Sequence, residues 1–314
     1  MNALQTVNNS IVVTAGEGLE NMRQLMSRYV SFIDAAPKTA EVYARNLRHF
    51  LDFLRDRFIG RPGREDVIAY RDELRATKAP ATVHAYITAV RLFFTWTAQE
   101  GLYPNIADHV KGAKIDREPK KDYLTAEQIK AVLSGIDQTS EAGKRDYAML
   151  YLMTVCGLRT VEVSRANIAD LRPLAGFTAL YVQGKGHDEK ADYVKVPAEV
   201  ERAIRAYLAA RKEKNPEAPL FASVSNSNEG GRMTTRSVSR IAKEAFKAAG
   251  YDSDRITAHS LRHTAVTLAL LAGEDITQVQ EFARHKNIAT TLIYSHALDK
   301  AKNNCSAQIA AALC

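Results

Sequence analysis

Two stretches in the second half of the chain decide its fold and its chemistry: HSLRH at residues 259–263 and ARHKNIATTLIYSH at residues 283–296. In the first, His259 and Arg262 are three residues apart, so a helix places both side chains on one face. In the second, a histidine precedes a tyrosine by nine residues, and a turn is expected between them near residues 286–287. Each stretch therefore combines a proton-transfer group with a cation or a nucleophile.

Two motifs lie upstream of these stretches. CGLRTVEV at residues 156–163 follows an apolar segment and contains Arg159 and Glu162. GKG at residues 184–186 places Lys185 between two β-prone runs. A lysine between glycines also occurs in nucleotide-binding loops, but the upstream glycine and the Ser or Thr of a P-loop are missing here, which excludes that interpretation.

Together these side chains suit the cleavage of a phosphodiester through a covalent enzyme intermediate. The nucleophile must lose a proton, and the departing oxygen must gain one. Fixed donors must match the negative charge of the phosphoryl oxygens, and the planar fork of arginine meets two oxygens at once. Such a site needs no metal and no nucleotide cofactor. The candidate catalytic residues are Arg159, Lys185, His259, Arg262, His285 and Tyr294.

The composition is compatible with a DNA-binding enzyme. The length of 314 residues suggests two domains or one large one. With 46% hydrophobic and 25% charged residues, the composition argues against global disorder. The net charge of +7 favours a polyanionic partner such as nucleic acid. The three cysteines show neither a disulfide framework nor metal-site spacing. We expect no metal centre.

The sequence shows neither a secretory signal nor a membrane span. The first residues lack a positively charged start before an apolar stretch. No run of about 18 apolar residues occurs. We therefore expect a soluble, cytoplasmic protein associated with the nucleoid and not with a membrane.

Periodicity predicts a small helical domain followed by a larger mixed one. Apolar residues recur at helical spacing over residues 39–58 and 81–101, with a short helix at 66–75 and a helical pattern starting at residue 19. The chain is divided into a flexible tail at 1–19, a helical domain at 20–112, a charged linker at 113–123 and a larger domain at 124–314.

The larger domain begins with a helix start signal and contains a hairpin. Thr125 is expected to cap a helix with Gln128 at its third position. Helices are expected near residues 125–135 and 140–156. Two β-prone runs at residues 178–183 and 192–196 predict an antiparallel hairpin, and after residue 197 the pattern predicts helix to the end. The fold class is mainly α with a small antiparallel sheet.

The order and spacing of these motifs resemble the tyrosine recombinase family, also called the phage integrase family, over residues 20–300. The resemblance rests on LRTVE at 158–162, the hairpin Lys185, HSLR at 259–262, and the His–Tyr spacing with TT between them. It implies a two-domain DNA clamp: a helical, SAM-like core-binding domain and a catalytic domain with a C-terminal tail helix. One position departs from the family: Arg284 stands where a glycine is usual, which would cost about 1 kcal/mol if the backbone there is left-handed and would add a phosphate contact.

The resemblance also implies roles for the candidate residues. Tyr294 would attack the scissile phosphate and form a 3′-phosphotyrosine, while Lys185 would protonate the leaving 5′-oxygen and His259 would help to take the tyrosine proton. A free 5′-hydroxyl of a second strand would then attack, through a Holliday junction. Glu162 would support the site, and His263 and His296, which lie off the matching positions, are assigned structural roles. The phosphate would be held by Arg159, Arg262 and His285.

Several side chains outside the catalytic set are candidates for DNA contact. One stripe follows the 81–101 helix and another follows a basic helix within 233–249, although a stripe of charge is often only a solvated face. The candidates are Arg45, His84, Thr88, Arg91, Arg236, Arg240 and Lys243.

The resemblance further implies that double-stranded recombination sites are the partners, with a dimer on each site, a homotetramer on two sites, and accessory proteins possible. The tail after residue 299 would pack on its own domain or on a neighbouring protomer. Two other functions stay open: a type IB-like topoisomerase with the same tyrosine chemistry, and a DNA-binding protein without catalysis. All six candidate catalytic positions carry the residue type that the chemistry needs, which argues against the non-catalytic DNA-binding protein.

The proposed acid role gives a first prediction. Lys185→Ala should slow strand cleavage, because the 5′-oxygen would leave without a proton. The same variant should cleave DNA with a sulfur atom in the 5′-bridging position at nearly the wild-type rate, because a thiolate leaves unprotonated. Cleavage time courses on the two substrates test this, and a defect of equal size on both would refute the acid role.

Overall fold

The computed structural model describes residues 27–114, 122–184, 189–302 and 305–313. The chain forms two compact units, Met1–Asp116 and Arg117–Cys314, whose boundary falls within the charged segment expected to be a linker. Within the described residues, no helix is both long and apolar enough to cross a membrane.

The first unit is entirely helical in its described part. A helical segment at 27–32 precedes a break at 33–36, so the single helical run expected from residue 19 is wrong at this point. The unit then contains α2 (Pro37–Asp56), α3 (Arg64–Thr77) and α4 (Pro80–Gln99). A proline starts α2 and α4, where its missing N–H costs nothing. Gly101, with φ 69°, follows the end of α4 as expected.

The core of this unit is an aromatic cluster between α2 and α4. Leu47 and Phe50 of α2 and Ile87 and Phe94 of α4 are fully or almost fully buried. Burial of such side chains contributes about 1.5–3 kcal/mol each. The opposite face of α4 stays available for other contacts.

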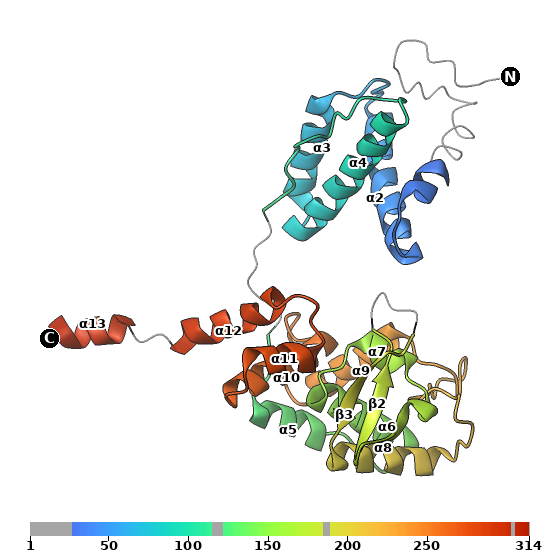
Figure 1. The fold of residues 1–314 in the computed structure, drawn as a ribbon, viewed down its shortest axis with the longest axis vertical. Coiled ribbons are helices and arrows are strands. Elements are labelled where there is room, and N and C mark those ends of the chain that lie inside the picture. Colours follow the sequence, from blue (N-terminus) through green and yellow to red (C-terminus); the bar gives the residue numbers. More distant parts are fainter. Residues whose placement is uncertain (1–26, 115–121, 185–188, 303–304, 314) are drawn as a thin grey trace. The chain divides into compact units, whose positions relative to one another are not determined.

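The second unit combines helices with one small sheet (Figure 1). The helices are α5 (Ala126–Ser134), α6 (Glu141–Val155), α7 (Thr160–Arg165), α8 (Ala198–Arg211), α9 (Thr235–Ala248), α10 (Ala258–Leu271), α11 (Ile276–Ala283), α12 (Ala289–Lys302) and α13 (Cys305–Leu313), with a 3-10 turn, η1 (Ile168–Asp170). Helix α6 packs against α8 and α10 and is buried over most of its surface. Thr125 caps α5 together with Gln128, as predicted.

The sheet has three antiparallel strands in the order β1 (Leu171–Leu174), β2 (Phe177–Val182) and β3 (Asp192–Val196). The predicted hairpin is confirmed as β2–β3, with Leu180 opposite Val194. Strand β1 was not predicted, since Pro173 lies within it and its two-residue turn, Ala175 and Gly176, requires positive φ at both positions.

The expectation of helix from residue 197 to the end is wrong for residues 212–234. Helix α8 ends at Lys212, which adopts a left-handed conformation. The following segment contains Pro216 and Pro219 and forms isolated bridges, including Asn167 with Pro219. Prolines that lack an N–H donor and a polar composition favour loop over helix here.

The first residue of the second unit's core is tied to α10 by one buried hydrogen bond. The Leu124 N–H donates to Thr264 Oγ1 at 2.9 Å, and both residues are buried. Thr264→Val should therefore lower the free energy of unfolding by about 1–3 kcal/mol, because the N–H would stay buried without a partner. Urea unfolding measures this effect.

Thr154→Val is the matched control for that measurement. The Thr154 hydroxyl donates to the Leu150 carbonyl within α6, which is a local bond that helices do not depend on. We expect a clearly smaller loss for this variant. Equal losses would show that the Leu124–Thr264 bond is not important for stability.

Candidate active site

Arg262 is the buried centre of the site. It lies on α10, is 1% exposed, and donates from Nη1 to the Gly157 carbonyl at 2.5 Å and from Nη2 to the Ala283 carbonyl. Gly157 follows α6 with φ 58°, and Ala283 is the last residue of α11. One guanidinium thus joins the ends of two helices that are far apart in sequence, and the segments after those ends carry the other candidate residues.

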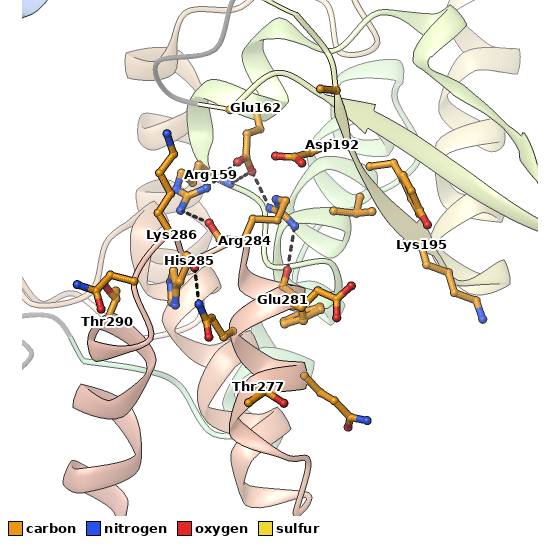
Figure 2. A pocket seen from close by; sticks show the side chains of 18 residues that line it. Arg159, Glu162, Asp192, Lys195, Thr277, Glu281, Arg284, His285, Lys286 and Thr290 are labelled. Carbon is orange, nitrogen blue, oxygen red and sulfur yellow. Dashed lines mark hydrogen bonds and ion pairs between the residues drawn. The ribbon is translucent and has the colours of Figure 1, made fainter.

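Arg159 is positioned by Glu162 at the start of α7. The Arg159 N–H donates to Glu162 Oε2 and its Nη1 donates to Oε1, both at 2.8 Å. Figure 2 shows this pair together with the approach of the Arg159 Nη2 to the Arg284 carbonyl, at 3.4 Å. The Glu162 side chain is fully buried, which agrees with its predicted supporting role.

Arg284 has the left-handed backbone that was considered for it, with φ 52° and ψ 46°. Its side chain turns inward: Nη2 pairs with Glu162 Oε2 at 2.9 Å and Nη1 donates to the Phe282 carbonyl at 3.0 Å. The left-handed backbone of Arg284 costs about 1 kcal/mol, and the side chain of the same residue forms a buried ion pair with Glu162. In this position the guanidinium supports the carboxylate that holds Arg159.

Three guanidinium groups in this cluster share one carboxylate, so the site carries excess positive charge. Burial, and then the charges of Arg159 and Arg284, lower the pKa of Arg262 to about 9. Burial would raise the pKa of Glu162, but the charge of Arg284, the Arg159 N–H and the charge of Arg159 outweigh it and lower that pKa. A cluster with this imbalance favours an anion as ligand.

His285 and Tyr294 come from the segment between α11 and α12 and from α12. His285 Nδ1 lies 2.9 Å from Thr291 Oγ1, which leaves Nε2 for a substrate. Burial and the charges of Arg262 and Arg159 lower the His285 pKa to about 4, so the ring is neutral at pH 7. The predicted turn at residues 286–287 is confirmed.

Tyr294 lies in a small apolar cluster with Val266, Val279 and Ala283, and is 8% exposed. Its ring is stacked on that of His285 at a centroid distance of 6.3 Å. Burial raises the pKa of its phenol, and the charges of Arg262 and Arg159 oppose that rise. The phenol is therefore protonated until another group takes its proton.

Of the two histidines of α10, His263 lies beside this tyrosine and His259 lies beside His263. The His259 side chain is more exposed than that of His263, which lies one helical turn further on and is half-buried. Their rings are in edge-to-face contact at 4.7 Å. His263 Nε2 lies 3.5 Å from Tyr294 Oη. From the sequence a structural role is predicted for His263, and the signal that points to the site is its spacing of four residues from His259.

The structure thus brings together five of the six candidate catalytic residues, all except Lys185, which lies outside the described residues. The flanking Gly184 is described: its carbonyl accepts a hydrogen bond from Arg165 Nη1 at 3.2 Å. His296 is placed on α12, and its side chain also lies outside the described part.

A pocket of about 1110 Å³ opens beside the cluster (Figure 2). Its walls are α11, strand β3 and the segment after α11, and Arg159, Arg284 and His285 line it. Tyr294 and Arg262 are not among its lining residues. The pocket therefore adjoins the cluster of candidate catalytic residues on the side of the β2–β3 hairpin and is not its centre.

The candidate DNA-contacting residues are placed on surfaces, with different surroundings. On the first unit, Arg45 and His84 are exposed, whereas Thr88 and Arg91 are half-buried. On α9 of the second unit, Arg236 is exposed. The other two candidates on α9, Arg240 and Lys243, each pair with a carboxylate.

Arg240 pairs with Glu244 at 2.8 Å, and Lys243 pairs with Asp252 at 3.0 Å. The α9 stripe is therefore less positive than its lysines and arginines alone suggest. In the described part of the chain, no three His, Cys, Asp or Glu side chains come together as metal ligands.

Comparison with known proteins gives the same picture. Residues 122–301 match the model of the phage integrase family, and residues 22–102 match the SAM-like N-terminal domain of phage integrases. The chain belongs to the phage integrase family. The resemblance stated from the motifs is confirmed, as is the mainly helical fold class with a small antiparallel sheet.

Its relatives include curated tyrosine recombinases. One is tyrosine recombinase XerC of Thermodesulfovibrio yellowstonii, 30% identical over 82% of this chain and 85% of that protein. Another is tyrosine recombinase XerD of Lacticaseibacillus casei, 29% identical over 88% of this chain and 94% of that protein. A solved structure of XerH bound to a palindromic difH substrate has the same fold, with a TM-score of 0.72, 20% identity, and coverage of 94% and 90%.

The shared carboxylate gives a prediction about acid stability. Glu162→Gln keeps the shape but leaves Arg159 and Arg284 without their buried anion, so the free energy of unfolding at pH 7 should fall by about 3 kcal/mol. The folded-state pKa of Glu162 lies below its unfolded value of 4.5, so the wild-type contribution is present above that pH and is lost in more acidic solution.

Urea unfolding of both proteins between pH 7 and pH 3 checks this, and the difference between them should shrink as the pH falls. Glu199→Gln is the control, because Glu199 pairs with Arg202 on the exposed surface of α8. Its effect should be under about 1 kcal/mol. A Glu162 variant as stable as this control would contradict the account.

Proposed function

We propose that this protein is a site-specific DNA recombinase that cleaves and rejoins strands through a 3′-phosphotyrosine at Tyr294. The observation that carries the proposal is the placement of this tyrosine beside an electropositive cluster. Arg159 and Arg262 both act on the phenol electrostatically, and His285 stacks on its ring. Tyr294 also packs in one cluster with Ala283, whose carbonyl accepts the hydrogen bond from Arg262, so the nucleophile would lie next to the anion site.

In this proposal the cluster holds the scissile phosphate. A guanidinium has five N–H donors, and the protein bonds of Arg262 engage two of its three nitrogens through Nη1 and Nη2. Arg159, which is partly exposed, and His285 Nε2 would supply further donors. Because burial makes these charges effective, the developing negative charge on the phosphoryl oxygens is stabilised without a metal ion.

The remaining chemistry is proton transfer. Tyr294 would pass its proton to the histidines of α10, in which His259 is expected to help, and Lys185 would protonate the leaving 5′-oxygen. The phosphotyrosine bond retains the energy of the broken phosphodiester, so rejoining by a second strand's 5′-hydroxyl, through a Holliday junction, needs no nucleotide cofactor.

We further propose a dimer on each DNA site and a tetramer on two sites. Solved structures with this fold include a lambda integrase dimer bound to a core site and a lambda integrase tetramer bound to a Holliday junction. On α13, Ile309 and Leu313 are 60% and 82% exposed. Such apolar exposure supports docking of the tail on a neighbouring protomer. We also propose that the protein associates with the nucleoid and that accessory proteins take part in the reaction.

The SAM-like unit and α9 would supply the phosphate contacts that position the DNA. In the first unit the exposed Arg45 and His84 are best placed, with Thr88 and Arg91 on the same α4 face. In the second, Arg236 has more freedom to meet a phosphate than Arg240 and Lys243, because those two have carboxylate partners.

The topoisomerase alternative and the silent DNA-binding alternative are not favoured. The curated relatives are tyrosine recombinases, and the closeness of the described candidate residues supports catalysis. A recombinase forms its product only when two cognate DNA sites are present, whereas a topoisomerase relaxes supercoiled DNA without them. An assay with one site and with two sites therefore separates the two functions.

Covalent trapping tests the function and finds the target. The protein is incubated with fragmented host DNA in buffer that contains EDTA, quenched with SDS, and the protein-linked ends are sequenced. We expect adducts at one or a few loci for the wild type and none for Tyr294→Phe, which lacks only the nucleophilic oxygen.

The variant Tyr294→Phe should still bind the recovered DNA, as measured by fluorescence anisotropy. Adducts scattered over the whole DNA would instead indicate a topoisomerase. An unchanged adduct yield in the variant, or a strict need for a metal ion, would overturn the proposal.

A further inference from the structure

We propose that His263 is a catalytic residue: it is the group that takes the proton from the Tyr294 phenol. The inference rests on the proposed role of Tyr294 as nucleophile, and it assigns the base that this role requires. It departs from the expectation that His259 takes this proton.

The geometry of the phenol favours His263. Its Nε2 is 3.5 Å from Tyr294 Oη, and among the hydrogen bonds of the described residues this is the one in which the phenol takes part. The two rings are 5.0 Å apart with an interplanar angle of 53°. A slight tightening of this distance in a DNA complex gives a normal hydrogen bond. The His259 ring, in contrast, contacts the His263 ring, and no contact of His259 with the phenol occurs among the described residues.

The surroundings make His263 an acceptor rather than a donor. The groups that face it are His259 and Arg262 from its own helix and Tyr294 from α12, and His285 stacks on the same tyrosine ring. Burial, and then His259 and Arg262, lower the pKa of His263 to about 4. A neutral imidazole has one nitrogen with a free lone pair, and the nitrogen that faces the phenol is Nε2.

The same surroundings make this base dependent on the substrate. A scissile phosphate held by Arg159 and Arg262 brings a negative charge that offsets the repulsion from Arg262, so His263 becomes a stronger base when DNA is bound. In the free protein the buried phenol keeps its proton, because burial raises its pKa. The nucleophile is therefore activated only in the complex.

The step is balanced as follows. The O–H bond of Tyr294 breaks, its proton moves to His263 Nε2, and the phenol oxygen forms the bond to phosphorus. The bond from phosphorus to the 5′-oxygen breaks, and that oxygen takes a proton from the general acid. In the rejoining step the imidazolium returns its proton to the tyrosine oxygen as this becomes the leaving group.

The test asks whether His263 acts as the base or has another role. It does so by changing the acidity of the nucleophile, because only the loss of a base is compensated by a more acidic phenol. The substrate is the DNA site recovered by covalent trapping, nicked so that cleavage is irreversible. It carries a 5′-bridging sulfur so that no acid is needed. His263→Phe keeps a ring against His259 and Tyr294 but removes the acceptor. We expect cleavage to slow by about 10²–10⁴-fold, with unchanged DNA binding.

Replacing Tyr294 with difluorotyrosine in the same His263→Phe protein should recover about tenfold or more of the lost rate, since the fluorinated phenol is more acidic than tyrosine and depends less on a base. His259→Phe is the matched control, and its defect should not be recovered. A His263→Phe protein that cleaves at the wild-type rate, or a defect that difluorotyrosine leaves unchanged, would overturn the proposal. So would recovery of His259→Phe in place of His263→Phe.

A wild-type protein that forms no adduct would refute the recombinase function itself, which is a different outcome from these. Should His263→Phe unfold at a lower temperature than the wild type, His263→Gln provides the second variant.

A measurement without turnover completes the test. In the Tyr294→Phe protein, NMR of labelled histidine should show the His263 pKa rising from about 4 when the DNA site binds. An unchanged or lower value in the complex would contradict substrate-dependent activation.

Discussion

The site depends on the hydrogen bonds that Arg262 makes with two backbone carbonyls. Gly157 and Ala283, which supply those carbonyls, are separated from Arg262 by 105 and 21 residues. A buried guanidinium without these partners would be too costly to keep. The bonds fix the two chain segments that carry Arg159 and His285, so the same residue that provides charge also fixes the positions of the other groups.

The burial that assembles the site also sets its protonation. Positive charge is concentrated on arginines, which stay charged, while His263 and His285 become neutral. A neutral imidazole carries one N–H donor and one acceptor nitrogen, so His285 can donate to an anion while His263 accepts a proton. Glu162 balances part of the charge and pairs with Arg284, a non-glycine residue in a left-handed position next to the candidate catalytic residue His285.

Local features of the site could be predicted from the sequence. The meeting of its residues in space, which come from distant segments of the chain, could not. The shared face of His259 and Arg262 follows from helical spacing, and the hairpin follows from two β-prone runs. The joining of distant segments depends on tertiary bonds that no spacing reveals. His263 was assigned to structure because its importance comes from the position of Tyr294, 31 residues away. Strand β1 was missed because Pro173 opposes strand propensity.

The central claim is that Tyr294 becomes covalently linked to DNA. The most direct measurement is mass spectrometry of the SDS-trapped adduct after nuclease and trypsin digestion. The account predicts a nucleotide on the peptide NIATTLIYSHALDK, residues 287–300, with fragment ions that place it on Tyr294. A nucleotide on any other residue would contradict the account, and so would a DNA-cleaving protein with no covalent adduct.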